Sequence, residues 1–161
     1  MAKRGARSSV DERGTDPALF EMLNRRFRFS LDVAANFENA KCKDFYDDDG
    51  HGNGLEMCWS GRVWCNPPYS NLGAWVQKAW SEWMETPGLE LIVMLVPANR
   101  TEQKWWQVWV EPSRDRTDAP LRVEFLPGRP RFTAPGAHSI PPNCRPPFGC
   151  ALLIWGVGGG E

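Results

Sequence analysis

The longest apolar run of the chain, residues 91–96 (Leu-Ile-Val-Met-Leu-Val), places the strongest limit on its fold. It is far shorter than the roughly 20 apolar residues that a membrane-spanning helix needs. An uninterrupted apolar strand is typical of a parallel sheet that helices cover on both faces, because neither face then meets water. The run therefore predicts a buried strand over 89–96 inside an α/β protein.

Strand-like and helix-like patterns alternate along the rest of the chain. After Pro17 and again after Asn71, apolar residues recur at the three- and four-residue spacing of one helix face. Thr15 or Asp16 is expected to cap the first of these helices. The alternation favours one compact α/β domain with a mostly parallel central sheet and helices on both faces. The expected helices are 16–28, 72–83 and 101–111, and the expected strands are 29–35, 42–46, 61–65, 89–96, 121–126 and 150–155.

The two ends of the 161-residue chain differ in composition from its centre. Residues 1–14 are charged and contain few apolar side chains, which predicts a flexible basic segment, and 156–161 predict a flexible tail. Residues 15–155 are enough for one domain with a sizeable core. Because the N-terminus lacks a hydrophobic secretion signal, we expect a cytoplasmic protein without membrane association.

Charge is unevenly distributed, although the net charge is only −1. Residues 1–30 hold seven Lys or Arg and four Asp or Glu, residues 31–58 hold two and seven, and residues 100–145 hold eight and five. An acidic centre between basic flanks suits a cationic small ligand in the middle and a polyanion across the rims. Solvated charged faces produce the same pattern, so both interpretations stay open.

The five cysteines include no Cys-x-x-Cys pair, and the two histidines have no ligand-like spacing to them. A disulfide framework and a metal site are therefore not expected, and free, mostly buried thiols are. The sequence also offers no serine or cysteine nucleophile with a paired histidine base.

The tetrapeptide Asn66-Pro67-Pro68-Tyr69 (NPPY) carries the clearest chemical signal. Its two prolines stiffen a loop at the end of the strand 61–65. The side-chain oxygen of Asn66 and the carbonyl of Pro67 can each accept a hydrogen from an exocyclic amine. Tyr69 can stack on the ring that carries this amine. If a sulfonium methyl group lies in line, transfer then depends on positioning and electrostatics more than on a strong base.

Acidic residues follow two of the other expected strands. Asp32 lies near the end of the first strand, and residues 47–49 (Asp-Asp-Asp) follow the second. In a parallel sheet these positions lie at the edge where ligands bind, and carboxylates there can hold ribose hydroxyls or a cationic group. For Asp49 a solvated turn is the preferred interpretation. The chain contains no Gly-x-Gly-x-x-Gly loop for a dinucleotide.

The stretch 15–155 resembles the small phage-type DNA N-6-adenine methyltransferases (Dam family), which use S-adenosylmethionine. The strongest similarities are Leu31-Asp32-Val33-Ala34-Ala35 with 39–42 (Asn-Ala-Lys-Cys), and 61–70 around the NPPY motif. The resemblance implies a Rossmann-like methyltransferase domain that methylates the N6 amine of an adenine flipped out of double-stranded DNA. A role in protecting phage DNA from host restriction would follow.

The resemblance also assigns roles to single residues. Asn66, Pro67, Pro68 and Tyr69 would form the catalytic loop. The chain departs from the family at Thr15-Asp16, where its relatives have Thr-Pro and this chain has its proline one place later. The loop 133–147 is the candidate for selecting the DNA sequence. Cofactor contacts are expected from Thr15, Asp32, Ala34, Asp47 and Asp48, and DNA contacts from Ser70, Arg100, Lys104, Arg129 and Arg131.

Two alternatives remain at the level of sequence. The same chemistry serves other amines, in RNA, at cytosine N4 or on a glutamine side chain. A catalytically silent DNA-binding protein would use the basic flanks alone. Whether the protein acts as a monomer or a weak dimer also stays open.

Overall fold

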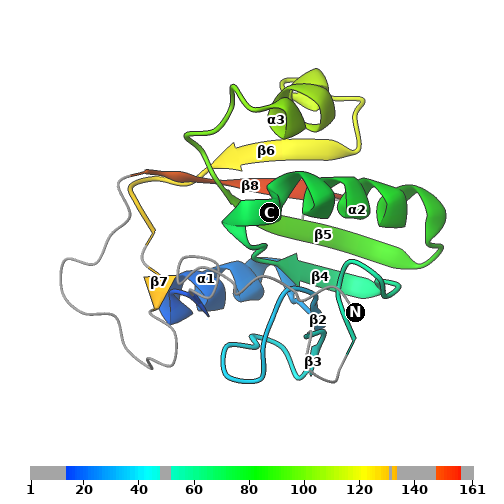
Figure 1. Ribbon diagram of the computed structural model, residues 1–161, viewed down its shortest axis with the longest axis vertical. Coiled ribbons are helices and arrows are strands. Elements are labelled where there is room, and N and C mark those ends of the chain that lie inside the picture. Colours follow the sequence, from blue (N-terminus) through cyan, green and yellow to red (C-terminus); the bar gives the residue numbers. More distant parts are fainter. Residues whose placement is uncertain (1–13, 48–51, 131, 134–147, 157–161) are drawn as a thin grey trace, which may run out of the picture.

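The computed structural model describes residues 14–47, 52–130, 132–133 and 148–156. Its centre is a six-stranded sheet with the order β3-β2-β4-β5-β8-β6. Figure 1 shows these strands one above another, from β6 at the top to β3 at the bottom. A separate two-stranded sheet pairs β1 with β7. The strands are β1 (Gly14–Thr15), β2 (Leu31–Asp32), β3 (Asp44–Phe45), β4 (Gly61–Cys65), β5 (Leu89–Pro97), β6 (Leu121–Phe125), β7 (Phe132–Thr133) and β8 (Cys150–Trp155).

The sheet is mostly parallel, as the sequence predicts. β2 pairs in parallel with β3 and β4, and β4 pairs in parallel with β5. β8 is antiparallel to both of its neighbours, β5 and β6. The last strand of the chain therefore lies inside the sheet and not at its edge. The carboxyl ends of β2, β4 and β5 consequently meet along one edge, beside which β1 and β7 lie (left in Figure 1).

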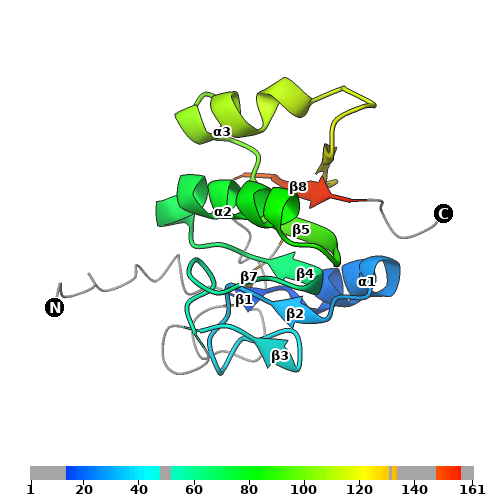
Figure 2. The ribbon, with the colours of Figure 1, turned by 90° about the vertical axis from the view of Figure 1, so that its right-hand side faces the viewer.

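Helices cover both faces of the sheet, and the side chains of the central strands alternate between them. In β5, Ile92, Met94 and Val96 pack toward α2 (Leu72–Glu85) and α3 (Lys104–Trp109). Their neighbours Leu91 and Val93 pack toward α1 (Pro17–Phe27). Figure 2 shows α1 and α2 on opposite sides of the strands. The apolar run is thus buried on both faces, and this burial accounts for its lack of alternation.

The first helix begins and ends at residues that the sequence favours. Asp16, and not Thr15, is the N-cap, and its side chain accepts a hydrogen bond from the Ala18 amide at 3.0 Å. Pro17 occupies the first turn. Arg28 ends the helix in the left-handed conformation, with a φ of 53°. Thr15 is therefore left outside the helix, in β1.

Glu82 on α2 is a buried acid that connects this helix to the preceding loop. Its carboxylate accepts hydrogen bonds from Lys78 at 2.5 Å and from Thr86 at 2.7 Å. It also accepts one from the backbone amide of the buried Trp59 at 3.0 Å. The loop 52–59 is thereby held against α2.

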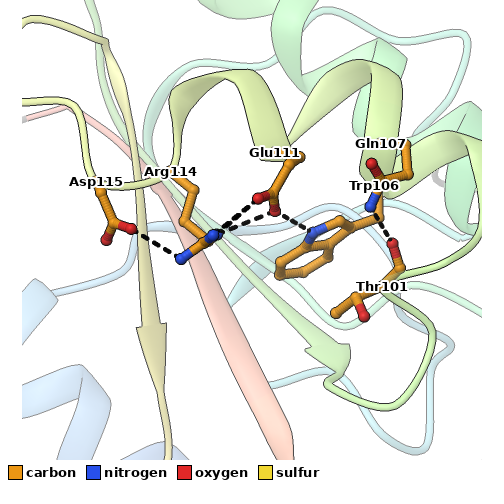
Figure 3. Close-up of polar contacts among 6 residues, drawn as sticks. All are labelled: Thr101, Trp106, Gln107, Glu111, Arg114 and Asp115. Atoms are coloured by element: carbon orange, nitrogen blue, oxygen red, sulfur yellow. Dashed lines mark hydrogen bonds and ion pairs between the residues drawn. The ribbon is translucent and has the colours of Figure 1, made fainter.

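α3 is shorter than the expected helix 101–111 and passes into the short helix η2 (Glu111–Ser113). Figure 3 shows the polar contacts that fix this corner. The Glu111 carboxylate accepts from the Trp106 indole at 2.9 Å and from the Arg114 guanidinium at 2.8 Å. From within α3, the Gln107 side-chain amide donates to the carbonyl of Thr101, which precedes the helix, at 2.7 Å. Side-chain hydrogen bonds thus fix the segments before and after α3 that the expected helix would have included.

Several boundaries differ from the expectations. β2 covers only Leu31–Asp32 of the predicted strand 29–35, and β3 covers only Asp44–Phe45 of 42–46. Two of the thiols are buried (Cys65 and Cys150), whereas Cys42 is half-buried and Cys58 is exposed. The expected flexible segments 1–14 and 156–161 lie outside the described residues except for Gly14, which begins β1, and Gly156; most of the loop 133–147 also lies outside them.

Candidate active site

Asn66 follows the last residue of β4, at the edge where the parallel strands end. Its side-chain nitrogen donates a hydrogen bond to the Thr15 hydroxyl at 3.0 Å. Thr15 comes from β1, which pairs in antiparallel register with β7. The Thr15 side chain is almost fully buried, with 1% exposed. The first residue of the NPPY motif is therefore fixed by a segment 51 residues away in the sequence.

Asp32 lies beside β4 in register with Trp64 and is also buried. One carboxylate oxygen accepts from the Ala34 amide at 3.3 Å, and the other accepts from the Lys41 amide at 2.9 Å. The two ends of the loop 34–41 are thus tied to the same side chain. Just beyond β2, the Val33 and Ala35 amides still bond to the Trp64 and Tyr46 carbonyls, whereas the Ala34 amide bonds to the Asp32 side chain.

A small pocket brings these residues together. Its walls carry an acid, a base and two side-chain amides beside a buried indole, and its volume of about 20 Å³ suits a small polar group. Four of its residues were expected from the sequence, namely Thr15, Asp32, Ala34 and Asn66, and the others are Gly14, Asn39, Lys41 and Trp64.

Burial shifts the ionisation of the charged groups in this pocket. The pKa of Asp32 is raised to about 6 because burial penalises its carboxylate more than the Lys41 and Ala34 amides stabilise it. Burial also lowers the pKa of the half-buried Lys41 ammonium, against the attraction of Asp32 and Asp16. A cationic ligand beside Asp32 would favour the ionised carboxylate, in line with the expected sulfonium.

Tyr69 lies in the short helix η1 (Tyr69–Asn71) and is enclosed from two sides. Its ring meets the Phe148 ring edge-on, with 5.7 Å between the centroids. The Arg100 guanidinium lies over the ring, 5.4 Å from its centroid, and also donates to the Tyr69 carbonyl at 3.1 Å. Burial raises the pKa of the neighbouring Cys150 thiol to about 11, against a hydrogen bond with Tyr69.

The sequence comparisons agree with this architecture. Residues 5–129 match the family described as DNA N-6-adenine-methyltransferase (Dam). The chain belongs to this family. It is similar to a DNA N-6-adenine-methyltransferase of Escherichia phage T1, with 34% identity over 76 residues. The aligned part is 46% of this chain and 30% of the phage T1 protein, so the chain spans less than a third of that relative.

The Dam-family match covers most of the site but not all of the sheet. It includes β1, Asp32 and the NPPY motif, whereas β8 (150–155) lies beyond residue 129. β8 nevertheless separates β5 from β6, and Phe148 directly before it packs on Tyr69. The part of the chain beyond the matched range therefore completes the surroundings of the motif.

Other predicted site residues lie around this pocket or elsewhere. Asp47 is buried just after β3 and does not line the pocket, and Asp48 lies outside the described residues. Of the expected DNA contacts, Ser70, Lys104 and Arg129 are exposed and Arg131 is outside the described residues. Arg100 is half-buried against Tyr69. The functional roles of all these residues stay predictions.

The sequence analysis missed Asn39 and Lys41 as pocket residues. Both belong to the stretch 39–42 that carries the resemblance, and that similarity was the available signal. Asn39 shapes the loop, because its side-chain oxygen accepts from the Asn36 amide at 2.7 Å. No local sequence pattern predicts that these two residues line the pocket. Their position depends on the hydrogen bonds from the Lys41 amide to Asp32 and from the Asn36 amide to Asn39.

Two absences concern only the part of the chain that the structure describes. Within it, no group of three or more His, Cys, Asp or Glu side chains is placed to hold a metal ion. No helix there is long and apolar enough to cross a membrane.

Proposed function

We propose that this protein transfers a methyl group from S-adenosylmethionine to the N6 amine of an adenine in double-stranded DNA. The observation that carries the proposal is the position of Asn66. It begins an NPPY motif, ends a parallel strand, and lines one pocket with Thr15 and Asp32 in a chain of the Dam family. A biological role in protecting phage DNA from restriction is part of the proposal.

The catalytic loop would work by accepting hydrogen bonds from the substrate amine and not by removing its proton with a strong base. The Asn66 side-chain oxygen and the Pro67 carbonyl each accept one hydrogen of the amine, which directs the nitrogen lone pair away from the ring. Pro68 has a φ of −62° and a ψ of 135°, an extended geometry that keeps the loop stiff. Tyr69 stacks on the flipped base, which must leave the duplex to reach this loop.

The polar groups that line the pocket beside Asn66 suit those of the cofactor, but its volume of about 20 Å³ is too small for the whole molecule. S-adenosylmethionine supplies an electrophilic methyl group when bound. The residues proposed to hold it are Asp32, Ala34 and the segment around Thr15, with Asp47 near the ribose. The Asp32 carboxylate offers a charge opposite to that of a sulfonium.

DNA would approach along the same edge of the sheet. Ser70 follows the motif directly, and Arg100 contacts Tyr69. Trp105, next to Lys104, lies beside Gly73 at the start of α2, so the first turn of α3 faces the same edge. Arg129 is a further proposed contact and is exposed. Phosphates attract such cations without reading the sequence.

The decisive experiment follows a labelled methyl group from S-adenosylmethionine onto DNA, RNA and protein. We expect label in DNA, at adenine N6, and its loss in Asn66→Ala with cofactor binding by calorimetry within a few-fold of the wild type. Asn71→Ala is the matched control, because Asn71 is exposed and its side chain does not cap α2.

Other outcomes would support the alternatives. Label in RNA or protein alone would reassign the amine. Retained DNA binding without cofactor binding would identify a silent DNA-binding protein. Full activity of Asn66→Ala would refute the role of Asn66.

A further inference from the structure

We propose that Thr15 is a positioning residue for Asn66. Its hydroxyl holds the amide nitrogen of Asn66 and thereby turns the amide oxygen toward the amine to be methylated. The inference rests on the proposed function, because it assigns that oxygen to a substrate amine. It also gives the Thr15 hydroxyl a role distinct from the direct cofactor contact that the family resemblance implies.

The geometry of the pair supports this assignment. The Asn66 nitrogen lies 3.0 Å from the Thr15 hydroxyl oxygen, which is within the usual range of a hydrogen bond. Thr15 is 1% exposed and its backbone is part of β1, whereas Asn66 is half-buried at the pocket. The hydroxyl is therefore the fixed partner and the amide is the group whose orientation is set.

An asparagine side chain needs such a partner to present one defined face. Rotation by half a turn exchanges the oxygen and the nitrogen with little change in shape, and the torsion that does so is broad. In the exchanged orientation the amide would present N–H groups to an amine that must itself donate, so productive binding would be lost. In the structure the Thr15 hydroxyl accepts from the nitrogen, and this arrangement leaves the amide oxygen on the side away from Thr15.

The other side-chain acceptors that line the pocket already accept hydrogen bonds from backbone amides. Both Asp32 oxygens accept from backbone amides, of Ala34 and Lys41. The Asn39 side-chain oxygen accepts from the Asn36 amide. Among the described pocket side chains, the Thr15 hydroxyl is thus the acceptor in place to fix the Asn66 nitrogen.

The kinetic test replaces Thr15 by valine, which keeps the shape and removes the hydroxyl. We expect Thr15→Val to lower kcat about tenfold, the size of effect of one lost orienting hydrogen bond, with KM for DNA and cofactor within twofold. Thr15→Ser should restore most of kcat. Thr86→Val is the matched control, because it removes a threonine hydroxyl from a bond to Glu82 at the far end of α2.

A second readout does not depend on activity. In side-chain amide NMR of the full chain, the Asn66 NH2 protons should exchange slowly in the wild type and in Thr15→Ser, and rapidly in Thr15→Val. If the wild type methylates no DNA, the proposed function fails, and amide exchange alone then decides whether Thr15 holds Asn66. Unchanged kcat and exchange in Thr15→Val would overturn the inference. A loss of activity that excess cofactor restores would overturn it too, in favour of a cofactor contact.

Discussion

The guanidinium of Arg100 lies 5.4 Å from the centroid of the Tyr69 ring and donates to the Tyr69 carbonyl at 3.1 Å. One side chain thus covers the aromatic ring of the NPPY motif and fixes its backbone. Phe148 meets the same ring edge-on. If a flipped base stacks on Tyr69 as proposed, it must share this ring with Arg100 or displace it, and this would connect Arg100 to base capture.

Replacement of Arg100 should therefore weaken DNA binding more than loss of an ordinary surface charge. We expect Arg100→Ala to reduce DNA affinity about tenfold, because a cation over an aromatic ring and a backbone hydrogen bond are lost together. Fluorescence anisotropy with labelled duplex measures this. The control is Arg122→Ala, an exposed arginine on β6. Equal losses in both variants would show that Arg100 acts only through net charge.

The ring of Tyr69 should matter more than its hydroxyl. Tyr69→Ala is expected to weaken binding of the flipped base by roughly 1–3 kcal/mol, the contribution of one base–aromatic contact. Tyr69→Phe keeps the ring and its edge contact with Phe148, so its KM for DNA should stay within about threefold of the wild type. Steady-state methylation with varied DNA gives both values. A Tyr69→Phe variant as impaired as Tyr69→Ala would argue against stacking.

Asp32 should make the protein without cofactor more stable toward mildly acid pH. Its folded pKa of about 6 lies above the ordinary pKa of an aspartate, 3.8, so the folded state binds a proton more tightly than the unfolded state does. The stabilisation from protonated Asp32 is complete below the pKa of this carboxyl in the unfolded chain and is lost as pH rises through about 6. Between pH 7 and 4.5 the free energy of unfolding should rise by about 2 kcal/mol relative to Asp32→Asn. Urea unfolding at several pH values tests this, and parallel curves for the two proteins would contradict it.

Glu82 should show the opposite pH dependence. Burial raises its pKa, but the hydrogen bonds from Lys78, Thr86 and the Trp59 amide outweigh burial and lower it overall. Its stabilisation is therefore present above the unfolded pKa of a glutamate and is lost as pH falls through that value. Glu82→Gln should reduce the free energy of unfolding at pH 7 by about 2 kcal/mol, because charge-assisted bonds become neutral ones. The difference in the free energy of unfolding between the two proteins should shrink below pH 4. A difference that does not change with pH would contradict a contribution from the ionised Glu82.

The sequence by itself determined the elements whose signal is local. The spacing of apolar residues predicts α2, the unbroken run 91–96 predicts β5, and β4 and β8 have the boundaries that their residues indicate. Capping residues do the same for the start of α1. The NPPY motif also stands out locally, since two prolines stiffen it and its chemistry lies in adjacent side chains.

Only the tertiary structure decided how these pieces combine. The place of β8 between β5 and β6, the pairing of β1 with β7, and the bond from Asn66 to Thr15 all join residues distant in sequence. The loop after β2 is fixed in the same way, because the Asp32 side chain accepts hydrogen bonds from the amides of Ala34 and Lys41. Such contacts depend on which strands lie side by side. The motif therefore predicts the reacting loop, and the fold supplies the contacts that hold it.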